Sequence, residues 1–208
     1  MMGETFKTTL SAVVSIHNEE AKLAACLESL GFADEVVVVL DRCTDSSEEI
    51  ARAHGAVIHH GAWELEGDRR NAAIAICSCD WILEVDADEH VSPELAQEIR
   101  ETVTNTKFDW HEIPVDNYIG DKLVRHGWGA SYGKAAYPGL FKKNTKIWGR
   151  QRVHPRLIWS GKKGPMLKQR LNHHVDRGVS DMIKRLDNYT NARAKDLRDE
   201  GTPGSYAG

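Results

Sequence analysis

The sequence predicts an α/β fold in which a mostly parallel sheet is covered by helices on both faces. Apolar runs of strand length alternate with helical patterns through residues 1–110, as in chains that build parallel sheets from strand–helix units. One run, residues 36–40, consists of four valines and a leucine, which is typical of a strand buried on both faces. Residues 111–208 contain short strand patterns and one long amphipathic helix, so we expect a small β region and a C-terminal helix beside the main sheet.

The first half of the chain divides into four strand–helix units with clear start and stop signals. Asn18 offers an N-cap for the first helix and Gly31 ends it, while Gly55 ends the second helix. Ser92 and Pro93 form an N-cap followed by proline at the first helical position, which marks the start of the fourth helix. We therefore expect strands at 10–16, 36–40, 56–60 and 81–85, and helices between 18 and 31 and over 46–54, 70–76 and 94–103.

The second half has a different pattern. Segments 112–119 and 122–126 flank Gly120 and Asp121, which predicts a β-hairpin. Glycine, tryptophan and tyrosine crowd residues 127–139, and this composition favours a binding loop over a core element. Two further strands, at 136–141 and 153–159, precede a helix over 180–198 that ends before Gly201 and whose apolar face carries Ile183, Leu186, Thr190, Ala194 and Leu197.

Charge is distributed unevenly along the chain. The formal net charge of the 208 residues is −4, but residues 1–119 hold 8 lysines and arginines against 24 aspartates and glutamates. Residues 120–208 hold 19 against 7, and thirteen cations occupy the stretch 122–175, which contains no acid. The apolar content of 41% excludes a disordered chain. The acidic first half excludes a uniformly cationic nucleic-acid binder.

Features of secretion and membrane insertion are weak in this sequence. No apolar run approaches the roughly 20 residues that span a bilayer. The N-terminal residues MMGETFKTTL lack the basic and then apolar layout of a secretory signal. Four cysteines at irregular spacing are too few for a disulfide framework, so we expect reduced thiols and a cytoplasmic protein.

Polar side chains follow three of the four predicted strands. His17, Asn18 and Glu19 follow the first strand and Asp41 follows the second. Ligands of open parallel sheets bind at these carboxyl ends. The turn after the first strand contains no glycine and two carboxylates, which would repel the pyrophosphate of a dinucleotide, so an NAD site is excluded. A nucleobase or ribose still suits Asp41, because its carboxylate can accept a hydrogen bond.

The fourth strand runs into a pair of alternating carboxylates, Asp86 and Asp88. Two carboxylates this close favour Mn²⁺ or Mg²⁺, since oxygen ligands suit these ions and the metal relieves the repulsion. The alternative is that Asp88 and Glu89 only favour the N-terminus of the next helix. Arg70, at the start of the third helix, suits a phosphate group, or else is a solvated helix residue.

Four segments follow one another along the first half of the chain: SAVVSIHNEE, VVVVLDRCTDSS, GDRRNAAIAI and DWILEVDADEHVSPEL. Taken together, they resemble family 2 glycosyltransferases of the GT-A fold, and especially bacterial lipopolysaccharide-core glycosyltransferases. This resemblance implies a Rossmann-like sheet and a single domain over 1–208. Its residues 1–110 would bind the nucleotide sugar and its residues 111–208 the acceptor. The implied reaction moves a sugar from a UDP- or GDP-sugar to a cell-envelope glycan or glycolipid, with inversion and with a divalent cation.

The resemblance also implies roles for individual residues. A late histidine, His173 or His174, falls where such enzymes bring one near the metal and the diphosphate. The implied nucleotide-sugar residues are His17, Asn18, Glu19, Asp41, Arg70 and Asp86, the metal ligands Asp86, Asp88 and His173, and the acceptor residues Arg125, His126 and Trp128.

No single residue of this sequence stands out as the general base. An inverting transferase needs a group that deprotonates the acceptor hydroxyl. The family carries a glutamate after the histidine that corresponds to His154, and here that position is Pro155. Asp121 and His154 are the leading candidates. Asp116, Glu112 and a retaining mechanism remain as alternatives.

The cations of the second half predict an anionic partner. The resemblance favours a phosphorylated or acidic glycolipid acceptor, with peripheral contact at the inner face of the cytoplasmic membrane as a further use of the basic surface. An RNA- or single-strand-binding domain is an alternative, but it leaves Asp41, Asp86 and Asp88 unexplained, so we expect no nucleic acid. A nucleotidyltransferase is the second alternative, although it normally has a glycine-rich basic loop after the first strand.

Overall fold

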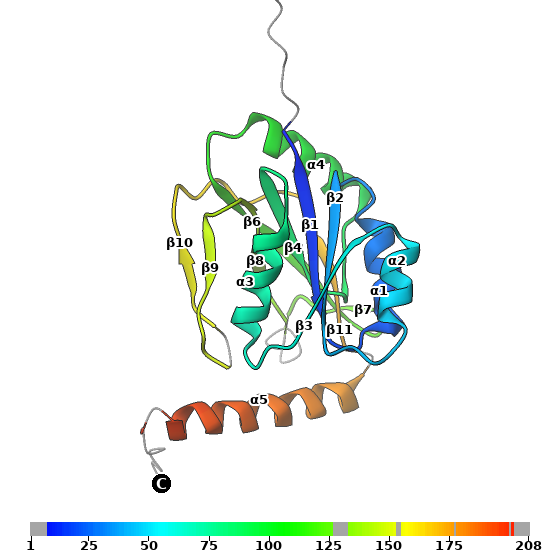
Figure 1. Ribbon diagram of the computed structural model, residues 1–208, viewed down its shortest axis with the longest axis vertical. Coiled ribbons are helices and arrows are strands. Elements are labelled where there is room, and N and C mark those ends of the chain that lie inside the picture. The colour runs from blue at the N-terminus through cyan, green and yellow to red at the C-terminus, as the bar shows by residue number, and fades with distance from the viewer. Residues whose placement is uncertain (1–7, 127–132, 153–154, 177, 200, 202–208) are drawn as a thin grey trace, which may run out of the picture.

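The protein is built around a sheet that continues from the first half of the chain into the second (Figure 1). The computed structural model describes residues 8–126, 133–152, 155–176, 178–199 and 201. Its strands are β1 (Leu10–Ile16), β2 (Glu35–Asp41), β3 (Val57–Gly61), β4 (Trp81–Val85), β5 (Glu89–His90), β6 (Trp110–Ile119), β7 (Lys122–Leu123), β8 (Ala136–Lys142), β9 (Lys146–Trp148), β10 (Leu157–Trp159) and β11 (Leu171–Asp176).

The first four strands form the predicted parallel sheet, in the order β3-β2-β1-β4. The apolar run of β2 is buried as expected, because Val37, Val38 and Val39 are each 0% exposed. In this arrangement the carboxyl ends of β1, β2 and β4 lie at one edge of the sheet. The polar residues that follow these strands therefore come together there.

The second half extends the same sheet. β8 pairs antiparallel with β4, β6 antiparallel with β8, β11 parallel with β6, and β5 antiparallel with β11. β7 pairs with β6 as the predicted hairpin, while β9 and β10 form a separate two-stranded sheet. The sequence did not indicate β5, β9 or β11. β5 and β9 are very short, and β11 (LNHHVD) is too polar to show a strand pattern.

Helices lie on both faces of the sheet, with α3 in front of it and α4 behind it in Figure 1. The predicted N-cap of α4 is confirmed, because Ser92 Oγ accepts a hydrogen bond from the Leu95 amide at 3.2 Å. The third helix begins at Glu66 and not at Arg70, so both neighbouring arginines of the sequence lie within it. The helices are α1 (Glu20–Ser29), α2 (Ser47–Ala53), α3 (Glu66–Ile76), α4 (Pro93–Asn105) and α5 (Val179–Asp199).

The C-terminal helix α5 crosses the edge at which the parallel strands end (Figure 1). Its predicted apolar side is not buried: Ile183 is 61% exposed and Leu186 49%, whereas Met182 is 3% exposed. The difference arises because α5 approaches the protein mainly through β11 and does not lie on a face of the sheet. Within the part of the chain that the structure describes, no helix is both long and apolar enough to cross a membrane.

Acids of the first half pair with many of the thirteen cations of residues 122–175. Eight of these cations form ion pairs, and seven of the eight do so with an acid from residues 1–119. Ion pairs between the two halves of the chain therefore compensate much of the uneven charge seen along the sequence. The pairs are Arg125–Asp116, Arg170–Asp116, Lys134–Asp86, Lys142–Asp109, Lys146–Glu84, Arg150–Asp68, Lys163–Glu112 and, within the second half, Arg152–Asp196.

Candidate functional site

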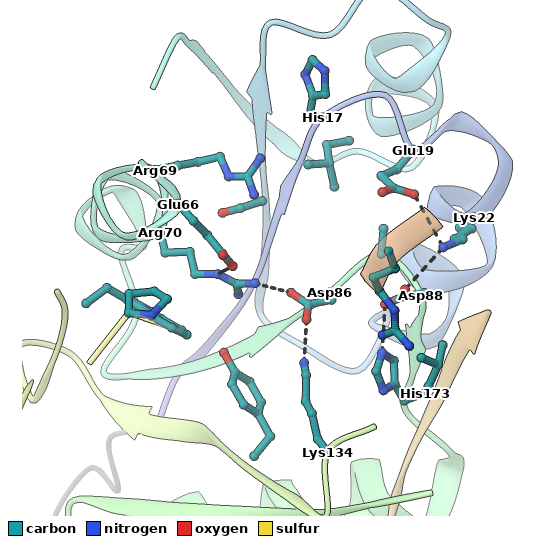
Figure 2. A pocket seen from close by; sticks show the side chains of 18 of the residues that line it. His17, Glu19, Lys22, Glu66, Arg69, Arg70, Asp86, Asp88, Lys134 and His173 are labelled. Atoms are coloured by element: carbon teal, nitrogen blue, oxygen red, sulfur yellow. Dashed lines mark hydrogen bonds and ion pairs between the residues drawn. The ribbon is translucent and has the colours of Figure 1, made fainter. Parts of the chain in front are cut away.

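A cavity of about 730 Å³ lies at the carboxyl ends of β1 and β4 (Figure 2). Residues of α3, β8, β11 and α5 complete its wall. The cavity occupies the place where ligands of open α/β sheets bind, and its size suits a small-molecule ligand. Of the predicted nucleotide and metal residues, the cavity brings together His17, Glu19, Arg70, Asp86, Asp88 and His173.

Asp86 lies in the cavity between two cations. Arg70 Nη2 is 2.7 Å from Asp86 Oδ1, and Lys134 Nζ is 2.6 Å from Asp86 Oδ2. Burial disfavours the charge of Asp86, but Arg70 and Lys134 outweigh it and hold the pKa of this carboxyl well below its usual value. Both oxygens of this predicted metal ligand are therefore engaged by protein groups in the present arrangement.

Arg70 is the centre of a set of ion pairs. Its Nε donates to Glu66 at 2.7 Å, its Nη1 to Glu84 at 3.0 Å and its Nη2 to Asp86 at 2.7 Å. The residue is 8% exposed, and its guanidinium lies 4.8 Å from the centroid of the Trp148 ring. Arg70 thus uses all three nitrogens on carboxylates of the protein, so its predicted contact with a phosphate would have to compete with them.

Behind Arg70 the ion pairs continue into the core. Lys146 is 2% exposed, and its Nζ lies 2.6 Å from Glu84 Oε2. Burial lowers the pKa of Lys146 to about 8, although Glu84 opposes this shift. The sequence reasoning missed this pair, and the available signal was a glutamate inside the apolar strand WILEV. We call the following set the buried charge network: Glu66, Arg70, Glu84, Asp86, Glu89, Lys134 and Lys146.

Lys134 and Glu89 complete the buried charge network at the cavity wall. Glu89 is 0% exposed; its Oε1 lies 2.9 Å from Lys134 Nζ and its Oε2 accepts the Asp86 amide at 2.8 Å. Burial raises the pKa of Glu89 to about 7. For Lys134, the nearby carboxylates of Asp86 and Glu89 outweigh burial and raise the pKa. Lys134 was not among the predicted site residues, but it does lie in the 127–139 segment expected to form a binding loop.

Asp88 and His173 face each other on the other side of the cavity. Asp88 Oδ1 is 3.6 Å from His173 Nε2, and Asp88 Oδ2 is 3.3 Å from Lys22 Nζ. His173 Nδ1 is 2.9 Å from Asn117 Oδ1, which also accepts the Lys134 amide, while Asn117 Nδ2 donates to the Lys134 carbonyl. This hydrogen bonding makes Asn117 Oδ1 an acceptor. His173 Nδ1 must therefore carry the proton, and Nε2 presents its lone pair to Asp88.

The Asp88–His173 pair fits a divalent cation. Burial lowers the pKa of His173 to about 4, so the ring is neutral at pH 7, and two electron-pair donors face each other across a short gap. A hydrogen bond from the second ring nitrogen is the usual arrangement of metal-binding histidines. Among the described residues no group of three His, Cys, Asp or Glu side chains could hold a metal. The remaining ligands would therefore have to come from water and substrate phosphates, as is common for Mg²⁺.

Asp41 lies at the end of β2, beside the cavity. Its carboxylate accepts from Arg42 Nε at 2.8 Å, from Arg42 Nη2 at 3.2 Å and from the Trp63 amide at 3.2 Å. Burial disfavours its charge, but these donors outweigh burial and lower the pKa of Asp41. The residue is 4% exposed, and Arg69, not Asp41, contributes to the cavity wall.

The loop after β1 is tied to the end of β2. His17 Nδ1 donates to the Asp41 carbonyl at 2.6 Å, which leaves the rest of the ring in the cavity wall. Asn18 adopts a left-handed conformation with φ of 56°, which asparagine tolerates better than most residues, and its Oδ1 accepts the Thr44 amide at 2.8 Å. Asn18 therefore links the loop after β1 to the loop after β2. Its side chain is exposed and does not line the cavity, whereas Glu19 does.

A second cavity of about 670 Å³ adjoins the first and shares Lys22, Asp88 and Val175 with it. Asp121, a predicted candidate base, lies in its wall together with His174. The alternative carboxylates are already paired: Asp116 with Arg125 and Arg170, and Glu112 with Lys163 at 2.8 Å. The other candidate base, His154, lies outside the described residues.

The predicted acceptor residues do not line either cavity where the structure describes them. Arg125 binds Asp116 through two hydrogen bonds, and its side chain is 51% exposed. His126 is exposed. Trp128 lies outside the described residues.

Comparison with known proteins identifies the family of this chain. The family model for glycosyl transferase family 2 matches residues 11–174. A glycosyltransferase of Rickettsia conorii, RC0292, is 24% identical over 96% of this chain and 74% of its own length. The lipopolysaccharide core biosynthesis glycosyltransferase LpsC of Rhizobium meliloti is 24% identical over 94% of this chain and 74% of its own length.

Solved structures show the same fold. Residues 1–349 of S. aureus TarS superpose with a TM-score of 0.59 at 15% identity, over 80% of this chain and 60% of TarS. A second TarS structure, in complex with UDP-GlcNAc, has a TM-score of 0.53 at 16% identity, over 78% of this chain and 60% of TarS. The present chain thus spans less than two thirds of that structure. From the match over residues 11–174 and the GT-A sheet, the chain belongs to glycosyl transferase family 2.

Proposed function

We propose that the protein transfers a sugar from a nucleotide-sugar donor to a hydroxyl group of a cell-envelope glycan or glycolipid, with Mn²⁺ or Mg²⁺ bound. The observation that carries the proposal is the Asp88–His173 pair, in which a carboxylate and an unprotonated imidazole nitrogen face each other 3.6 Å apart. The pair lies in the cavity at the strand ends, where a family 2 enzyme would bind its donor.

The cavity suits the diphosphate of such a donor. Lys22, Arg69, Lys134 and Arg185 all contribute cationic side chains to its wall. A divalent cation held by Asp88 and His173 would neutralise the charge that develops on the leaving diphosphate. In this proposal the buried charge network holds Asp86 and Lys134 in place beside the diphosphate.

We assign the general base of an inverting reaction to Asp121. In an inverting transfer, the acceptor oxygen forms a bond to the anomeric carbon while the bond to the diphosphate breaks, and the base takes the hydroxyl proton. Asp121 lines the second cavity, which adjoins the first at Asp88, and it makes no ion pair with any described residue. Asp116 and Glu112 are both engaged by cations, which favours Asp121 over them.

The acceptor is proposed to be an anionic glycolipid such as a lipopolysaccharide core. LpsC supports this choice as a relative of that named role. Five cations of residues 122–175 make no ion pair with a described residue and could contact such an acceptor, together with Arg125, His126 and Trp128. These cations are Lys122, Lys143, Arg156, Lys162 and Lys168.

Residues 1–110 would then supply most of the donor site, with Lys134, His173 and Arg185 added from residues 111–208, whose remaining surface would contact the acceptor. The reaction would take place at the cytoplasmic side of the membrane. RNA binding, the alternative use of the basic half, has less support, because eight of the thirteen cations are paired with carboxylates.

Thermal-shift measurement with a panel of nucleotide sugars, each with and without Mn²⁺, tests the proposal. We expect one nucleotide class to raise the melting temperature, and to do so much more strongly with Mn²⁺. The Asp88→Asn variant should lose the metal-dependent part of the shift. If no nucleotide sugar stabilises the wild-type protein, or if the shift is the same without metal, the proposal is wrong.

A further inference from the structure

Two neighbouring arginines of α3, Arg69 and Arg70, extend toward the cavity, but they differ in how closely the protein pairs them with carboxylates (Figure 2). Arg70 binds three carboxylates at 3.0 Å or less, as described above. Among the described residues, Arg69 has a single ion pair, in which its Nη1 lies 3.5 Å from Asp41 Oδ2. At this separation the contact is at the outer limit of a hydrogen bond.

The guanidinium of Arg69 is also incompletely hydrogen bonded. The side chain of Arg69 is 17% exposed. Its Nε is buried and has no hydrogen-bond partner among the described residues. A buried donor without an acceptor costs about 1–3 kcal/mol. Turning the side chain into the cavity would therefore break no strong interaction, and an oxygen acceptor there would satisfy donors that the protein leaves unused.

Asp41 cannot take up the remaining donors of Arg69. Its oxygens already accept three hydrogen bonds of 2.8–3.2 Å from Arg42 and the Trp63 amide. Arg42 reaches back to Asp41 from a left-handed backbone conformation, with φ of 51°. The carboxylate is thus an anchor for two arginines and has little capacity left to accept a hydrogen bond from a ligand.

We propose that Arg69 binds the donor nucleotide directly, by donating to one of its acceptor oxygens, and that Asp41 is a positioning residue for Arg69. The ligand class is a nucleoside diphosphate, so this inference rests on the proposed function. Arg69 reaches Asp41 at the end of β2, whereas Asp88 and His173 belong to the β4 and β11 side. This placement assigns Arg69 to the nucleoside end of the donor or the adjoining phosphate.

Isothermal titration with UDP and GDP in the presence of Mn²⁺, on the full chain, tests the assignment. Replacing Arg69 by Gln should weaken the nucleotide that wild type prefers by about 10- to 100-fold, the loss expected for one charged hydrogen bond. Arg69→Lys keeps the charge and should recover part of the affinity. The matched control is Arg52→Gln on α2, which removes an arginine that is 72% exposed and paired with Glu48, and it should bind as wild type does.

Titration of the corresponding nucleoside identifies the oxygen that Arg69 contacts. If Arg69→Gln loses the same factor of affinity for the diphosphate and for the nucleoside, Arg69 contacts a base or ribose oxygen. If only the affinity for the diphosphate falls, Arg69 contacts a phosphate oxygen. For Asp41, the double variant Asp41→Asn with Arg69→Gln should bind no more weakly than Arg69→Gln alone, because Asp41 acts through Arg69. Additive losses in this cycle would overturn the positioning role.

The result that overturns the assignment is an Arg69→Gln variant that binds within twofold of wild type. Thermal unfolding of both Arg69 variants shows that the comparison is made on folded protein. If wild type itself binds no nucleotide, the proposed function fails as a whole. If wild type binds and both variants bind equally well, only the Arg69 assignment fails.

Discussion

The two sides of the cavity contain the same kinds of charged residue but differ in how those charges are paired. On the Arg70 side, carboxylates and cations of the buried charge network neutralise one another at 2.6–3.0 Å. On the Asp88 side, a carboxylate that is 22% exposed faces an imidazole lone pair 3.6 Å away. The short buried ion pairs hold the fold together, whereas Asp88, whose ion pair with Lys22 is longer at 3.3 Å, has its other oxygen directed at the His173 ring and can bind a ligand there. The comparison therefore assigns stability to one side and chemistry to the other.

The largest effect is expected from Asp88→Asn. This substitution removes the negative charge of Asp88 beside His173 with little change in shape, so the rate of sugar transfer should fall by about 100- to 1,000-fold. Initial rates with the identified nucleotide sugar, at saturating Mn²⁺, measure this loss. Asp68→Asn serves as the control, because Asp68 pairs only with the exposed Arg150 among the described residues. A variant that transfers at the wild-type rate would remove Asp88 from the chemistry.

Lys146→Met tests whether the buried charge network stabilises the fold. Removing one partner of a buried ion pair typically costs about 3–5 kcal/mol, and Glu84 would be left with Arg70 and the Trp148 indole as its donors. Denaturant unfolding should show a loss of about 3 kcal/mol, and the double variant with Glu84→Gln should recover much of it. A single-variant loss below about 1 kcal/mol would mean that the network does not stabilise the fold.

Asn117→Ala tests whether the hydrogen bond from His173 to Asn117 supports metal binding by the Asp88–His173 pair. Asn117 fixes the proton on His173 Nδ1, and losing such an outer partner commonly costs about 10- to 100-fold in metal affinity. The Mn²⁺ concentration for half-maximal activity should rise by this factor, with activity recovering at high Mn²⁺. Asn105→Ala, at the exposed end of α4, is the control. An unchanged Mn²⁺ requirement would contradict the role of the Asn117–His173 hydrogen bond.

Lys146 should also make the stability of the protein depend on pH. Its folded pKa is about 8, below the usual value of about 10.4. Between these values the unfolded chain holds the proton and the folded protein has released it, so the unfolded state binds more protons and stability rises with pH. Unfolding at pH 8, 9 and 10 should show this rise in wild type but not in Lys146→Met. Parallel curves for the two proteins would contradict the lowered pKa.

Much of the cavity at the strand ends could be predicted from the sequence. Parallel strands place all their carboxyl ends at one edge of a sheet, so the strand pattern alone predicts that His17 and Asp86 come together there. The α5 prediction failed in part, because helical periodicity reports which side is apolar and not what lies against it. Ile183 and Leu186 therefore remain exposed although they form a regular apolar side.

The alternation of strands and helices in the first half, the acids at the strand ends and the family could all be predicted from the amino-acid sequence, because they depend on local patterns and contiguous motifs. Which charges are already paired depends on the three-dimensional fold. Arg69 and Arg70 are adjacent and chemically identical in the sequence, yet in the part of the chain that the structure describes Arg70 pairs with three carboxylates and Arg69 with one, at the longer distance of 3.5 Å. The same is true of the thirteen cations of residues 122–175, most of which pair with distant acids. Ion pairing acts over a few ångströms in space, and separation along the chain carries no information about it.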